Sequence, residues 1–170
     1  MLRLLARVLK ILNSEIDPGQ IAGAVALAAV LGLTPLWTLH NLLVLLLVLL
    51  LRVNLSSFIL AWGVFTLFAF ALDPLFDAVG HAVLTAGALQ PLWSALYATD
   101  VGRLSDFNNT VVMGSLLVSL LLAPLLYAGT VYAVRQYRGT VRAWMRDKPI
   151  YQLVRRTRLI SLYETMRDGG

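Results

Sequence analysis

The sequence predicts an all-α integral membrane helical bundle with discontinuous or re-entrant helices and basic amphipathic termini. Apolar residues make up 59% of the 170 residues and charged residues only 14%, against roughly 45–50% and about 25% in soluble domains. The windows 18–51, 53–72, 78–99 and 107–134 contain no Asp, Glu, Lys or Arg. Charge-free apolar stretches of about 18 or more residues are typical of membrane spans, because a soluble helix needs charge on its outward face.

Residues 1–16 are predicted to form an amphipathic interfacial helix. Arg3, Arg7 and Lys10 share one strip of a helical projection and leucines occupy the opposite side. We expect the cationic strip to face anionic lipid headgroups. A signal peptide is the weaker alternative, because the apolar stretch begins only near residue 21 and continues into a second one.

The membrane domain, residues 17–134, opens with a helix that is too short to span a bilayer. Asp17 is a typical N-cap and Pro18 fits the first helical position, so a helix is expected from there to about Leu33. Its length of roughly 20 Å falls short of a hydrocarbon core of about 30 Å. We therefore expect a half-helix or a re-entrant segment.

Small residues recur at four-residue spacing in two of the predicted helices. Such stripes let another membrane helix approach closely, since lipid offers no hydrophobic driving force for association. They comprise Ala24, Ala28 and Gly32 in the first helix, and Ser115, Ser119 and Ala123 in the last.

A break inside the first window is expected where Thr34 and Pro35 repeat the combination of N-cap and proline. A second helix should start there and run to Leu51. A helix that begins inside a membrane has unpaired N–H groups and a partial positive charge, so it needs an acceptor. The residues assigned to helix breaks are Gly32, Pro35 and Pro91.

Polar side chains near this break form the candidate ligand-binding site, which comprises Thr34, Thr38, His40, Asn41, Asn108 and Asn109. The acceptor at the helix start can be a substrate carboxylate, a lipid phosphate or a neighbouring side chain. Structural roles are the simpler alternatives: a neutral His40 imidazole bonded to an adjacent helix, and capping of the last span by Asn108, Asn109 and Thr110.

The later windows differ in continuity. Residues 55–72 form an apolar segment that Asp73 and Pro74 should end, and residues 107–134 form the clearest span. Window 78–99 is interrupted by glycines and Pro91, which predicts another broken or re-entrant element. Residues 33–38 (LTPLWT) match residues 89–94 (LQPLWS) at four of six positions, so a duplicated unit and a chance similarity both remain open.

Residues 135–170 are predicted to be a basic cytoplasmic tail. Arginines recur there at three- and four-residue steps, and we expect contact with lipid headgroups from Arg135, Arg138, Arg142 and Arg146. Positive charge at both ends places both termini in the cytoplasm and makes the number of crossings even. One arrangement has four spans, 36–51, 55–72, 78–98 and 107–134, and the other has two, with the early helix pair and the middle window re-entrant.

Enzyme chemistry is not expected. The chain has no cysteine, two distant histidines and no catalytic or phosphate-binding motif, so we assign no catalytic residue, metal site or cofactor. Asp73 and Asp77 lie one turn apart and could bind a cation, although a cap is the simpler interpretation. The basic residues lack the pattern of a nucleic-acid surface.

The stretches 32–41 (GLTPLWTLHN) and 107–115 (FNNTVVMGS) resemble those of a bacterial family of small membrane proteins catalogued as a domain of unknown function. The family pattern centres on a glycine, a proline and a histidine, matched here by Gly32, Pro35 and His40. The resemblance covers about residues 17–134 and implies a location in the bacterial cytoplasmic (inner) membrane. It transfers no activity or catalytic residue.

The expected function is non-enzymatic. The broken helix favours a transporter-like or transport-accessory subunit that handles a lipid or a small anionic solute. The alternative is a membrane scaffold or adaptor whose small-residue faces bind a partner's transmembrane helix. The expected partners are anionic membrane lipids, with a membrane protein or a second copy of the chain as further possibilities.

Overall fold

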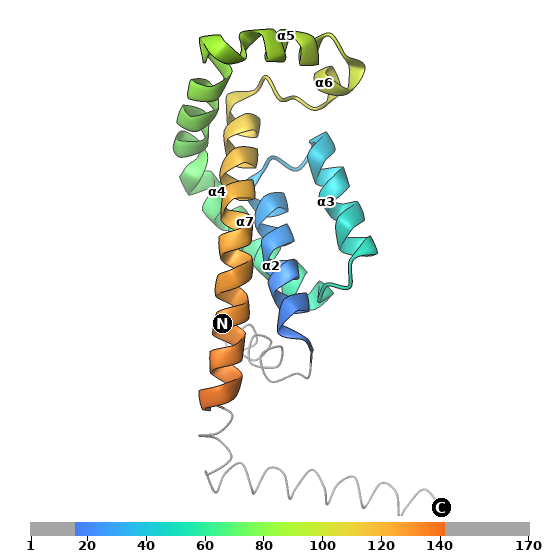
Figure 1. The fold of residues 1–170 in the computed structure, drawn as a ribbon, viewed down its shortest axis with the longest axis vertical. Helices are drawn as coiled ribbons and strands as arrows, with labels where there is room; N and C mark the ends of the chain where they lie inside the picture. The colour runs from blue at the N-terminus through green and yellow to red at the C-terminus, as the bar shows by residue number, and fades with distance from the viewer. Residues whose placement is uncertain (1–15, 142–170) are drawn as a thin grey trace, which may run out of the picture. The chain divides into compact units, whose positions relative to one another are not determined.

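The computed structural model describes residues 16–141, and these residues are almost entirely helical, with no strand among them (Figure 1). Glu15–Tyr132 form one compact unit, and the chain from Ala133 onward belongs to a second one. The predicted interfacial helix and most of the basic tail, with Arg3, Arg7, Lys10, Arg142 and Arg146, lie outside the described residues. The all-α prediction is confirmed.

Helix α2 (Pro18–Leu33) has the bounds that the sequence predicts. Asp17 occupies the N-cap position, but its carboxylate makes no capping bond. Its backbone carbonyl instead accepts hydrogen bonds from the amides of Gln20 (3.0 Å) and Ile21 (3.4 Å). The helix ends because Thr34 adopts an extended backbone conformation.

The small-residue face of α2 packs as predicted. Ala24 and Ala28 have no exposed surface. A Cβ placed on Gly32 would lie only 2.8 Å from the Cβ of Phe65 in helix α4 (Leu55–Leu84). Because real Cβ atoms essentially never come that close, only glycine lets the two helices approach to this distance.

Helix α3 (Leu39–Leu50) begins later than predicted. Residues 34–38 are not helical, so the expected start at Thr34 and Pro35 is wrong by four residues. In a helix starting at Pro35, the Pro35 carbonyl would accept a bond from the amide of Leu39. The side chains of Thr38 and Asn41 bond to that carbonyl instead, which favours an open loop.

Helix α4 runs for 30 residues without stopping at Asp73 and Pro74, so the predicted end at residue 72 is also wrong. Proline removes one backbone donor, but the helix continues past it and changes direction along its length (Figure 1). Packing beyond the proline explains the continuation, since Phe76 is fully buried and Gly80 touches the next long helix.

Window 78–99 is broken, as predicted. Helix α4 ends at Leu84, the short helix η1 (Gly87–Leu89) follows, and α5 (Gln90–Tyr97) lies across the end of α4 (Figure 1). Pro91 sits in the first turn of α5, so the break comes before it. Residues 34–38 form a loop whereas residues 90–94 are helical, so the short sequence match does not correspond to a structural repeat.

Helix α7 (Thr110–Gln136) packs antiparallel against α4 with backbones in contact. A Cβ on Gly114 would lie 1.8 Å from the carbonyl oxygen of Phe76, and one on Gly80 would lie 1.8 Å from that of Thr110. The Thr110 hydroxyl also donates a hydrogen bond to the Asp77 carboxylate. Ser115 and Ser119 are fully buried, which fits the small-residue stripe predicted for this helix.

Two helices among the described residues are long and apolar enough to cross a membrane: α4, and the helix that continues from Thr110 to Thr140. Helix α3, at about 18 Å, is too short, and window 78–98 is not one helix. Of the four spans in the four-crossing arrangement, residues 36–51 and 78–98 therefore do not form helices long enough to cross a membrane. The outer surface is strongly apolar, with Leu49 80% and Leu67 75% exposed.

Candidate functional site

The loop between α2 and α3 gathers four of the six predicted site residues. The Thr34 hydroxyl lies 2.7 Å from the Val30 carbonyl oxygen and 2.8 Å from Asn41 Oδ1. Asn41 Nδ2 donates to the carbonyl oxygens of Pro35 (2.7 Å) and Leu36 (3.5 Å). Thr34 and Asn41 are 5% and 2% exposed, so this network is shielded from the surface.

This network closes the tip of the α2–α3 hairpin. Backbone carbonyls at a helix end and in the loop after it have no backbone donor. Where water is excluded, side chains must donate the hydrogen bonds that these carbonyls need. Here the carbonyls of Val30, Pro35 and Leu36 are satisfied by Thr34 and Asn41. The polar atoms of Thr34 and Asn41 are thus used within the loop, and these two residues build the site rather than offer free groups to a ligand.

His40 is placed differently, because it is only half-buried. Its Nε2 lies 3.0 Å from the hydroxyl oxygen of Thr38, the residue just before α3, and not against an adjacent helix. Helix α3 starts at this point without a side-chain cap. The imidazole and the first amides of α3 therefore lie together at the tip, beside the exposed side chains of Leu36 and Trp37.

Asn108 and Asn109 belong to another part of the fold. Asn109 Oδ1 accepts hydrogen bonds from the amides of Val111 (2.9 Å) and Val112 (3.2 Å), so the simpler prediction of a cap on the last span holds for this residue. Asn108 is exposed and lines an open pocket of about 440 Å³ at the end of α4. No described hydrogen bond joins either residue to the hairpin tip.

Three aromatic rings line this pocket: Trp93, Tyr97 and Phe107. The ring centroids of Trp93 and Phe107 are 5.9 Å apart, and those of Tyr97 and Phe107 are 6.3 Å apart in an edge-to-face arrangement. Sequence reasoning missed these residues. The four-residue step from Trp93 to Tyr97 places both rings on one helix face, but nothing local indicates that Phe107 returns to meet them.

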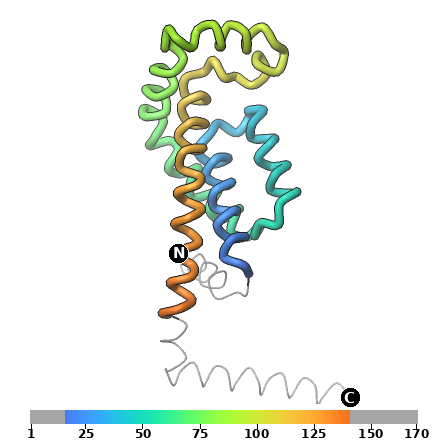
Figure 2. Tube along the Cα trace, viewed as in Figure 1, coloured from blue at the N-terminus to red at the C-terminus, as the bar shows by residue number. Residues whose placement is uncertain are grey.

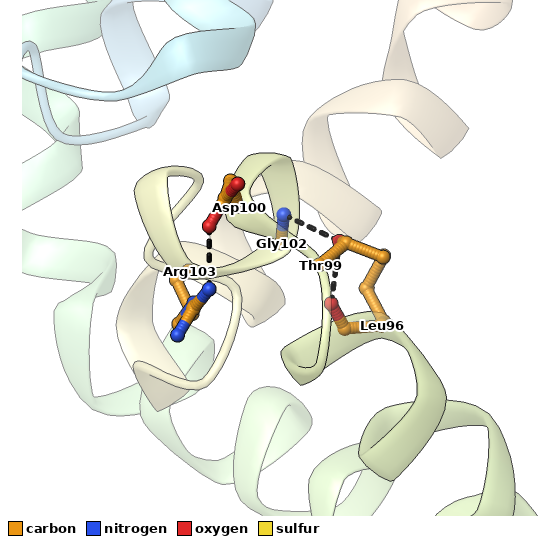
Figure 3. A network of polar contacts seen from close by, with 5 residues as sticks. All are labelled: Leu96, Thr99, Asp100, Gly102 and Arg103. Atoms are coloured by element: carbon orange, nitrogen blue, oxygen red, sulfur yellow. Dashed lines mark hydrogen bonds and ion pairs between the residues drawn. The ribbon is translucent and has the colours of Figure 1, made fainter.

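The turn after α5 is held by a network of polar contacts (Figure 3). The Thr99 hydroxyl donates to the Leu96 carbonyl (2.7 Å) and accepts from the Gly102 amide (3.0 Å), which caps α6 (Asp100–Leu104). Asp100 and Arg103 form an exposed ion pair on the same short helix. A Cβ on Gly102 would lie 2.0 Å from the Leu96 carbonyl oxygen, so α5 and α6 are held tightly together.

Among residues 16–141, no group of three or more His, Asp or Glu side chains is placed to hold a metal ion. Asp73 and Asp77 lie inside α4 and not at a helix start, so the capping interpretation is wrong for them. Of the predicted headgroup contacts, Arg135 lies exposed in the last turn of α7 and Arg138 lies in the π-helix η2 (Tyr137–Val141).

Comparison with known proteins confirms the resemblance to an uncharacterized bacterial family. Residues 2–143 match a family described as an uncharacterized protein conserved in bacteria (DUF2062), a longer match than the expected 17–134. An uncharacterized protein of Treponema pallidum (strain Nichols) is 30% identical over 155 residues, which cover 91% of this chain and 96% of that protein. No solved structure matches the chain with significance. The chain belongs to the bacterial DUF2062 family.

Proposed function

We propose that the protein is an integral protein of the bacterial inner membrane that crosses the bilayer twice, through α4 and α7, with both termini in the cytoplasm. Its apolar exterior supports this proposal. In the most apolar 18-residue stretch of α4, only 11% of the residues are buried within the protein. In the corresponding stretch of the helix that begins at Thr110, 28% are buried. Soluble monomers rarely expose continuous apolar surface on this scale, whereas lipid covers such a surface without cost.

Helices α2 and α3 form a re-entrant hairpin in this proposal. The amide of Asn54 donates to the carbonyl of Gln20 (3.1 Å), which joins the two open ends of the hairpin at the level where α4 starts. Gly32 near the tip packs against Phe65, ten residues or about 15 Å along α4 from Leu55. The tip therefore reaches about halfway into a core of about 30 Å. Figure 2 shows the two arms running side by side toward this tip.

The proposed activity is non-enzymatic handling of a lipid headgroup or small anionic solute at the hairpin tip. One observation carries the proposal: α3 begins without a side-chain cap, next to the half-buried His40. The amides of a helix start attract negative charge, and this attraction strengthens where water is scarce. In this assignment Thr34 and Asn41 hold the loop in its non-helical conformation, Thr38 orients the imidazole, and His40 with the α3 amides meets the ligand.

The test compares the two histidines of the chain, because His81 is exposed on α4 and far from the tip. Wild type, His40→Ala and His81→Ala are purified in mild detergent, and bound lipids are weighed by native mass spectrometry with phosphatidylglycerol and phosphatidylethanolamine supplied equally. We expect wild type and His81→Ala to retain more phosphatidylglycerol than phosphatidylethanolamine. In His40→Ala the ratio of the two retained lipids should fall about tenfold, which corresponds to 1.4 kcal/mol. Equal retention by all three proteins would contradict the proposal.

A scaffold or adaptor role is the second candidate. It is favoured by an exposed leucine face on α3. The side chains of Leu42, Leu46 and Leu49 are 66%, 49% and 80% exposed. A partner's transmembrane helix, or that of a second copy, could pack on this face. A second polypeptide in stoichiometric amount in the same mass spectra would favour the adaptor, whereas lipid alone favours ligand handling.

A further inference from the structure

The pocket at the end of α4 has a wall of fixed aromatic rings. The Trp93 indole N–H donates to the carbonyl of Val83 (3.2 Å), so the indole presents its ring surface and not its donor. Phe107 is 8% exposed and contacts both other rings, which makes it the back of the pocket. Tyr97 is 51% exposed and forms the outer edge. The rings come from two separate segments that the fold brings together.

The same pocket contains exposed polar groups. Within residues 16–141, the side chains of Ser94, Tyr97 and Asn108 line the pocket and make no hydrogen bond to the protein, so they are open to water or to a ligand. They offer two hydroxyls and one amide. No charged side chain is among the six residues that line it, which also include Leu84.

We propose that this pocket binds an uncharged polyhydroxy group, a sugar or a polyol, either free or as the headgroup of a lipid. The C–H faces of such a group pack on aromatic rings, while its hydroxyls bond to Ser94, Tyr97 and Asn108. An acyl chain in the pocket would displace water from those three polar groups without replacing its hydrogen bonds. A phosphate or carboxylate would find no cation in the lining to compensate its desolvation.

The pocket's size and position fit this class of ligand. Its volume of about 440 Å³ lies within the range of about 300–1,000 Å³ found for small-molecule sites. Helix α5 lies across the end of α4 (Figure 1), and the pocket lies where the two helices meet, since it is lined by Leu84, the last residue of α4, and by Ser94 of α5. A headgroup at a membrane surface and a free sugar could both reach it there. This site is separate from the hairpin tip and does not depend on the function proposed for that region.

The experiment observes Trp93 directly. The chain has four tryptophans, so full-length protein labelled with 5-fluorotryptophan gives few ¹⁹F resonances, and that of Trp93 is assigned with Trp93→Phe. The protein is placed in phospholipid nanodiscs prepared without glycoside detergents. In one arm glucose is added to the solution, and in the other the nanodiscs contain glucosyl-diacylglycerol, with plain diacylglycerol as the lipid control.

We expect a saturable shift of the Trp93 resonance, with the other three unchanged, in at least one arm. The arm that responds identifies a free sugar or a lipid headgroup as the source. Ser94→Leu and Asn108→Leu should each weaken the response at least tenfold, and the matched control Ser56→Leu, which changes an exposed serine at the other end of α4, should leave it unchanged. The proposal is overturned if Trp93 responds in neither arm, responds equally to plain diacylglycerol, or responds unchanged in both pocket variants.

Discussion

Replacing Gly114 with alanine should strongly destabilise the fold. The new Cβ would lie 1.8 Å from the Phe76 carbonyl oxygen, about 1.6 Å inside ordinary van der Waals contact. That oxygen belongs to the backbone of α4 and cannot rotate away. Either α4 and α7 separate near Gly80, or the helix backbone distorts.

The expected cost is about 3 kcal/mol, at the upper end of the range of about 1–3 kcal/mol for inserting a methyl group into a packed core. Separation of the helices would also loosen Phe76, which is fully buried between them. Gly80→Ala should cost a similar amount. The double variant should lose less than the two single losses added together, because one separation relieves both clashes.

Gly129→Ala is the matched control, since it changes the same helix at a site where nothing lies within 4 Å of the new Cβ. It should be neutral or should gain up to about 1 kcal/mol from helix propensity. The assay is reversible unfolding in mixed micelles, followed by helical circular dichroism and by tryptophan fluorescence. Wild-type stability of Gly114→Ala, or equal destabilisation of Gly129→Ala, would show that α4 and α7 do not need a glycine at residue 114.

Three further predictions use the same unfolding assay. Asn41→Leu should lose about 1–3 kcal/mol, because it removes a buried amide that lies 2.8 Å from the Thr34 hydroxyl and donates to the loop carbonyls, while Thr85→Val, which removes an exposed hydroxyl, should stay within about 0.5 kcal/mol of wild type; equal losses would contradict the role given to Asn41. Asn109→Ala should lose about 1 kcal/mol through loss of the α7 cap, whereas Asn109→Asp should retain it; an equal effect of the two changes would argue against capping. Asp106 has a φ of 53°, so Asp106→Val should lose about 1–2 kcal/mol and Asp106→Gly should not; a stable valine variant would show that this backbone conformation is not required.

The first helix could be predicted from sequence because its signals are local. Asp17 and Pro18 start it, and the small residues that end with Gly32 define its packing face, whatever it packs against. The start of α3 could not be predicted in the same way. The side chains that hold Pro35 out of the helix include Asn41, which bonds back across the loop.

Longer-range packing decided the other differences. The sequence signal at Pro74 is a helix stop, but burial of Phe76 and contact of Gly80 with α7 keep the helix continuous. The two asparagines before α7 looked like one feature, yet one caps the helix and the other lines a pocket. The start of α7 gives Asn108 and Asn109 different roles although they are adjacent in sequence. The reversal of the chain through α6 brings Phe107 back to Trp93.

The most direct test of the account is the sidedness of single cysteines, for which the cysteine-free chain is a clean background. Asp17→Cys, Arg52→Cys and Leu104→Cys all place the thiol at an exposed position. A membrane-impermeant maleimide is applied to spheroplasts and to inverted membrane vesicles. A re-entrant hairpin followed by a crossing α4 predicts that residues 17 and 52 react only in inverted vesicles and residue 104 only in spheroplasts. Labelling of residues 52 and 104 from the same side would contradict it.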